Sequence, residues 1–160
     1  MDYLETTTLN RDLVLEFFLV LSRMEFALKV SGFAIGSENS VAPDWDGYAG
    51  QIRDTFSKDE TLELLEASNY YLTTPPQKQV LDNEVLAWSS MVPNNPAEID
   101  VLLILVRRVR NNLFHGGKYN SQAHDETARN ESLLRYGITI LKASMILVPN
   151  VKAAYSGAAI

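Results

Sequence analysis

The residues best suited to chemistry lie together near the end of one predicted helix. Arg110, Asn111 and His115 fall within six consecutive positions, and Gly116-Gly117 follow them directly. Asn111 and His115 are four positions apart, so they share one face of a helix. The long Arg110 side chain can reach the same space, because the glycines predict the end of the helix there. A histidine that titrates near neutral pH beside an arginine is suited to proton transfer at a bound phosphate.

Basic residues surround this group, although the chain as a whole is acidic. The net charge is −6, with 17 acids and 6 bases in residues 1–100 against 3 acids and 8 bases in residues 101–160. Arg107, Arg108 and Lys118 flank the group. A local cationic patch of this kind can hold the phosphates of a nucleic acid. An ordinary scatter of surface charge explains the same counts, so charge alone leaves both interpretations open.

The pattern Arg110-Asn111-x-x-x-His115, at a predicted helix end, resembles the signature of the HEPN domain family. In that signature an arginine and a polar residue precede a histidine at the same spacing. The resemblance implies an all-α bundle that forms a homodimer, in which the motifs of the two subunits meet in a composite site. It also implies a metal-independent endoribonuclease of the kind found among toxins and defence effectors. An antitoxin or another protein partner would accompany such an activity.

The resemblance further implies a role for each residue of the motif. The ribose 2′-OH of RNA would attack the adjacent phosphate, with His115 as general acid or base. Arg110 would stabilise charge on the phosphoryl oxygens, and Asn111 would orient His115 or the phosphate. The residues that would bind flanking phosphates are Lys118, Arg107 and Arg108. Some family members have lost catalysis, so the alternative is a non-catalytic RNA- or nucleotide-binding module, or a helical protein-interaction module.

The other residues that could do chemistry are assigned structural roles. No cofactor or metal is expected, because the chain has no cysteine and the nine-residue spacing of His115 and His124 fits no helical pair of metal ligands. His124 is interpreted as a surface residue. Glu25 could face the motif, but we expect it to sit among solvated charges. Trp45 and Trp88 lie on apolar stripes, and we expect both in the core.

Six helical segments are expected to position the motif. The first five are predicted to begin at side chains that can cap a helix. These capping residues are Asn10, Asp44, Ser57, Thr74 and Asn95. The first segment runs to about residue 32, the fourth covers residues 74–92, and the fifth ends at the glycines after the motif. The sixth begins between residues 121 and 127 and runs to about residue 148. Residues 34–43 are expected to form a loop, and no strand is predicted.

Together these segments predict an all-α bundle built on three long helices, with shorter helices added. We expect one HEPN-like domain over residues 1–150 and a flexible C-terminal tail over residues 151–160. The last helix is apolar on several sides, which indicates deep burial or a subunit interface. The acidic N-terminus and the short apolar runs predict a cytoplasmic protein without a membrane segment.

Overall fold

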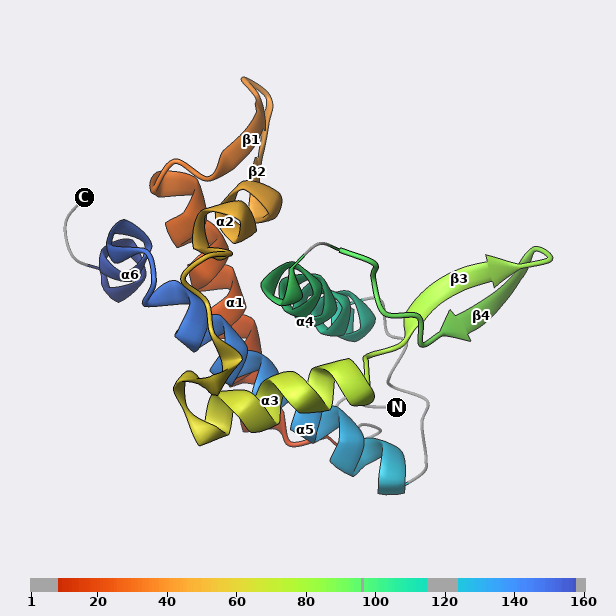
Figure 1. Cartoon of the computed structure of the whole chain (residues 1–160). Coiled ribbons are helices and arrows are strands. Elements are labelled where there is room, and N and C mark those ends of the chain that lie inside the picture. Colours follow the sequence, from red (N-terminus) through yellow and green to blue (C-terminus); the bar gives the residue numbers. More distant parts are fainter. Residues whose placement is uncertain (1–8, 96, 115–123, 158–160) are drawn as a thin grey trace.

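The structure is a helical bundle from which two β-hairpins project (Figure 1). It is a computed structural model that describes residues 9–95, 97–114 and 124–157. The helices are α1 (Arg11–Val30), α2 (Trp45–Ile52), α3 (Leu62–Thr73), α4 (Glu98–Phe114), α5 (His124–Met145) and α6 (Pro149–Ser156), with a short 3₁₀ turn, η2, at Lys58–Glu60. The strands are β1 (Ala34–Ser37), β2 (Ser40–Pro43), β3 (Lys78–Asp82) and β4 (Val85–Ser89). The chain is therefore mostly helical, but the expectation of an all-α fold is wrong.

Helix α1 begins and buries its apolar face as the sequence predicts. The Asn10 side chain accepts a hydrogen bond from the Leu13 N–H at 3.1 Å, which satisfies one of the free amides of the first turn. The buried positions recur every three or four residues along the helix: Leu13, Phe17, Val20, Leu21, Met24, Ala27 and Leu28. After the helix, Gly32 adopts a φ of 94°, a conformation that glycine reaches without strain.

The core forms where α5 packs against α1 and α3. Tyr71 on α3 donates a hydrogen bond to the Leu133 carbonyl on α5 at 2.6 Å. A Cβ atom at Gly137 would lie 2.6 Å from the Tyr71 hydroxyl and 2.9 Å from the Phe17 ring. Glycine at this position therefore allows three helices to approach more closely than any larger residue would permit.

The apolar side chains of α5 are explained by burial within one chain. Buried residues on this helix include Leu133, Leu134, Ile138, Ile140, Leu141 and Met145. Of the two explanations that the sequence leaves open, deep burial is confirmed for these six. A row of exposed apolar side chains lies on α1 instead, where Leu15, Phe18, Leu19 and Phe26 are between 41% and 55% exposed.

The two hairpins replace a predicted loop and a predicted helix. Strands β1 and β2 pair antiparallel from Ala34↔Pro43 to Ser37↔Ser40, where a loop is expected. Strands β3 and β4 pair antiparallel from Lys78↔Ser89 to Asp82↔Val85, inside the helix predicted over residues 74–92. Figure 1 shows the β3–β4 hairpin extending away from the helices.

The helical prediction over residues 74–92 fails because the short apolar runs in this segment fit a strand as well as a helix. Leu81, Val85 and Trp88 fit a helical stripe, but the same residues also suit two short strands. Asn83 and Glu84 both adopt positive φ angles, of 49° and 64°, and make the tight two-residue turn without a glycine. Trp88 is consequently 37% exposed on β4, so its expected place in the core is wrong.

Two further boundaries differ from expectation. Thr61 caps α3 by accepting a hydrogen bond from the Leu64 N–H at 3.1 Å, whereas Ser57 starts only the short turn η2. Part of the expected flexible tail forms α6, in which Val151 and Ala154 are buried. None of the helices in the described part of the chain is both long enough and apolar enough to cross a lipid bilayer.

Side chains of α4 hold the base of the β3–β4 hairpin on both sides. Arg108 donates hydrogen bonds to the Pro76 carbonyl at 3.1 Å and to the Met91 carbonyl at 2.9 Å. Asn112, one turn further along, donates to the Gln77 carbonyl at 2.7 Å. These hydrogen bonds from α4 therefore fix the position of the hairpin relative to the motif.

Candidate nucleic-acid interface

The described part of the motif opens onto a hollow in the surface of about 500 Å³. Residues from α1, from both hairpins, from α2 and from α4 line this basic hollow. They are Glu25, Ala42, Pro43, Trp45, Lys78, Ile104, Arg107, Arg108, Arg110 and Asn111. Four of these side chains are basic and one is acidic. An anion entering the hollow therefore meets net positive charge, on a chain whose net charge is −6.

The last residues of α4 present Arg110 and Asn111 to the hollow. Asn111 is exposed, and the Arg110 side chain is 34% exposed. His115 and Lys118 lie outside the described residues, so the structure places neither of them. The structure places the first two residues of the motif, Arg110 and Asn111, in one hollow with Arg107 and Arg108 of the same helix.

Arg110 forms an ion pair with Glu25 across the wall of the hollow. The Arg110 Nη2 and Glu25 Oε1 atoms are 2.7 Å apart, and the Glu25 side chain is 23% exposed. The expectation that Glu25 sits among solvated charges is therefore wrong. The pair joins α1 to the end of α4 and directs the guanidinium of the motif.

Arg107 is held against the side of the hollow formed by α2. Its guanidinium carbon lies 5.6 Å from the centre of the Trp45 ring, within the range of a cation–π contact. Its Nη2 atom lies 4.0 Å from Oδ1 of Asp46, which is 92% exposed. Burial lowers the pKa of Arg107 and so does the nearby charge of Arg110, whereas Asp46 and Glu25 oppose that shift. Arg107 is thus a partly desolvated cation whose charge is only partly balanced.

Arg108 lines the hollow and also holds the fold. Its hydrogen bonds to two carbonyls at the base of the β3–β4 hairpin engage the guanidinium in holding the fold. Burial lowers the pKa of Arg108. Arg108 therefore anchors the hairpin, and its expected role in binding a flanking phosphate stays a prediction.

Three residues of the hollow that could contact a ligand are not assigned to the site from the sequence: Lys78, Glu25 and Trp45. Lys78 comes from the start of β3, a strand that the sequence does not predict. Glu25 reaches the motif only through the packing of α1 beside α4, 85 positions away in the chain. Trp45 is buried at 4% exposure, as expected, but it also lines the hollow. No local pattern identifies these contacts, because they arise when distant elements pack together.

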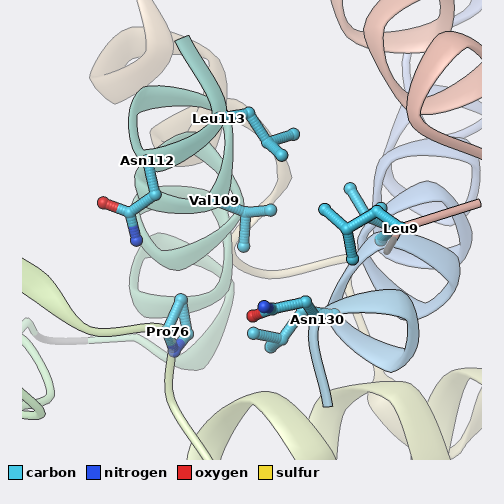
Figure 2. A pocket seen from close by; sticks show the side chains of 8 residues that line it. Leu9, Pro76, Val109, Asn112, Leu113 and Asn130 are labelled. Carbon is cyan, nitrogen blue, oxygen red and sulfur yellow. The ribbon is translucent and has the colours of Figure 1, made fainter. Parts of the chain in front are cut away.

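A second, smaller space lies behind the same helix (Figure 2). It is mostly apolar, and the residues that line it are Leu9, Pro76, Val109, Asn112, Leu113, Asn130, Leu133 and Leu134. Figure 2 shows Val109 of α4 facing Leu9 and Asn130 across it. The space is too small for a nucleotide, and we interpret it as a packing gap between α4 and α5.

Comparison of the chain with protein-family models, with curated proteins and with solved structures gave no match.

Proposed function

We propose that the protein is a HEPN-type metal-independent endoribonuclease that acts as a toxin or defence effector in the cytoplasm. The observation that carries the proposal is the position of Arg110 and Asn111 in a basic hollow near the end of α4. His115 follows Phe114 directly in the chain, so the histidine of the motif is at most a few ångströms of backbone from this helix end.

In this proposal the ribose 2′-oxygen attacks the adjacent phosphorus, and the bond to the 5′-oxygen of the next nucleotide breaks. The products are a 2′,3′-cyclic phosphate and a 5′-OH end. His115 serves as general acid or base in the transfer of the proton from the 2′-OH to the leaving oxygen. Arg110 stabilises charge on the non-bridging oxygens, and Asn111 orients the phosphate or His115. Arg107, Lys78 and Lys118 bind flanking phosphates.

Glu25 supports this chemistry as a positioning residue. Its carboxylate lies 2.7 Å from the Arg110 guanidinium and therefore restricts the rotation of a long side chain before RNA binds. Because the Arg110 guanidinium is already oriented, its surroundings need less reorganisation when the transition state forms.

The proposal includes a two-fold homodimer that brings two motifs into one composite site. The exposed row on α1 continues to the motif, because Phe18 packs against Phe114 with ring centres 5.5 Å apart. Phe114 is itself 59% exposed and immediately precedes His115. An apolar surface at this position would place two copies of His115 near one interface when it pairs with itself. An antitoxin would act by covering the same region.

The experiment is incubation of the purified protein with total RNA in EDTA. Wild type should cut RNA, and His115→Ala should reduce the rate by about 10²–10⁴-fold. Arg110→Ala should cost about 10²–10³-fold through lost stabilisation of charge. Lys152→Ala, which changes an exposed lysine on α6, is the matched control and should cut like wild type. Intact RNA with wild type would reject the nuclease and leave the non-catalytic binding module.

A further inference from the structure

Two buried N–H groups in the basic hollow have no acceptor in the described part of the chain. They are the Trp45 Nε1–H and the Arg107 Nε–H, and each nitrogen is inaccessible to solvent and lacks a hydrogen-bond partner. Both residues line the hollow, and the Arg107 guanidinium lies over the Trp45 ring. A buried donor without an acceptor costs free energy, so such groups are uncommon in folded proteins and indicate a missing partner.

The neighbouring acids do not supply that partner. Glu25 accepts its hydrogen bond from Arg110 at 2.7 Å. Asp46 is 4.0 Å from the Nη2 atom of Arg107 rather than paired with Nε, and its side chain extends into solvent at 92% exposure. Neither acid therefore satisfies the two donors, and an acceptor on a bound ligand would do so once the Arg107 side chain shifts to admit it.

The charge of the surroundings selects the class of acceptor. Lys78, Arg107 and Arg110 line the same hollow, and Glu25 balances one of these charges. The lowered pKa of Arg107, caused mainly by burial, agrees with a cation that lacks a full counter-charge. A neutral acceptor would satisfy the two N–H groups but leave the positive charge uncompensated. An oxyanion accepts the hydrogen bonds and also balances the charge.

We propose that the basic hollow contains a phosphate-binding subsite in which the Trp45 Nε1–H and the Arg107 Nε–H donate to the phosphate oxygens, with Lys78 and Arg110 supplying further positive charge. Its assignment to the RNA backbone rests on the proposed function, and it names a contact beyond the Arg-Asn-His motif. The subsite would hold a phosphate next to the phosphodiester that is cleaved. It would thereby fix the register of the RNA strand along α4.

Binding can be measured without cleavage and with Trp45 itself as the reporter. The chain has two tryptophans, so Trp88→Phe leaves Trp45 as the only tryptophan whose emission is followed. This variant is titrated with inorganic phosphate and, separately, with a 2′-deoxy oligonucleotide that cannot react through a 2′-OH. The proposal predicts a saturable change in Trp45 emission with the oligonucleotide. A response to inorganic phosphate alone would make the ligand free phosphate and would overturn the assignment to RNA.

Affinity for a labelled 2′-deoxy oligonucleotide, measured by anisotropy, tests the two donors directly. Trp45→Phe removes the N–H but keeps an aromatic ring beneath Arg107, and Arg107→Lys keeps the charge but removes Nε–H. Each should weaken binding about tenfold or more, since each loses a hydrogen bond to a charged group. Lys152→Ala should bind like wild type.

Circular dichroism establishes that each variant is folded, and if Trp45→Phe is not, Arg107→Lys and the Trp45 emission decide the question. Wild-type affinity in folded Trp45→Phe and Arg107→Lys would overturn the subsite. Binding that depends on both donors in a protein that leaves RNA intact would reject the ribonuclease and retain the subsite.

Discussion

The pairing of Arg110 with Glu25 decides how the motif is presented to a substrate. Arg110 is the residue with the clearest electrostatic role in the proposed reaction, and its guanidinium is already engaged at 2.7 Å before any substrate is present. The carboxylate therefore has two opposing effects: it orients the arginine, and it offsets part of the positive charge that attracts RNA. These effects are separable: the orientation of Arg110 affects the rate of cleavage in the bound complex, whereas the offset of positive charge affects the affinity for RNA.

Glu25→Gln should lower both KM and kcat for RNA cleavage. KM should fall by about 2- to 5-fold, the range that an ion pair exposed to this degree supports, because the hollow loses a negative charge. kcat should fall because Arg110 loses its fixed orientation. Glu16→Gln on the same helix is the matched control, since Glu16 pairs with Lys142 away from the hollow. A raised KM with unchanged kcat in Glu25→Gln would contradict the positioning role.

Single residues also show how far a sequence can predict a site. Arg107, Arg110 and Asn111 are identified correctly as neighbours because one helix carries all three. Lys78 is not identified, and Glu25 is considered but assigned to solvent, because the proximity of both residues to the motif depends on how α1 and β3 pack beside α4. Their residue types are ordinary, and nothing in their local sequence distinguishes them from solvated surface charges.

The first and fifth predicted helices are the elements that the sequence predicts well. Asn10 caps α1 as expected, and the buried apolar run Val101–Val106 lies in α4 as expected. The hairpins are missed because the turn at Asn83 and Glu84 contains no glycine, and because short apolar runs suit a strand or a helix equally. A capping residue and sufficient length do not by themselves ensure a helix, because the segment over residues 74–92 has both and forms a hairpin, so tertiary contacts decide between the two structures.

The close approach of α1, α3 and α5 gives a prediction at the scale of elements. Gly137→Ala should destabilise the fold by about 1–3 kcal/mol, because the added Cβ would lie 2.6 Å from the Tyr71 hydroxyl. Gly50→Ala on α2 is the control, since the nearest atom lies 4.0 Å from its added Cβ, and it should leave stability unchanged or raise it slightly. Urea denaturation measures both. Equal stability of the two variants would show that the helices do not meet as described.

Across the whole molecule, charge and apolar surface are concentrated in adjoining places. The basic hollow lies near the end of α4 on a chain whose net charge is −6, and Phe114 connects that end to the exposed row on α1. A protein that pairs through this row would bring two hollows together while its acidic surface repels nucleic acid elsewhere.

Light scattering tests whether the row on α1 joins two copies. Wild type should be a dimer at micromolar concentration, and Phe26→Asp should be a monomer because it buries a charge in the proposed interface. Ile146→Asp is the matched control, since Ile146 is 54% exposed on another part of the surface and its substitution should leave the dimer intact. A monomeric wild type would exclude the composite site.

The nature of the RNA ends produced in EDTA tests the central claim most directly. Mass spectrometry of the fragments from a defined single-stranded RNA reads those ends without any assumption about the target sequence. We expect 2′,3′-cyclic phosphate and 5′-OH ends from wild type, none from His115→Ala, and no cleavage of the 2′-O-methyl form of the same strand, since the attacking oxygen is the ribose 2′-OH. Fragments with 3′-OH ends, or cleavage of the 2′-O-methyl strand, would contradict the account.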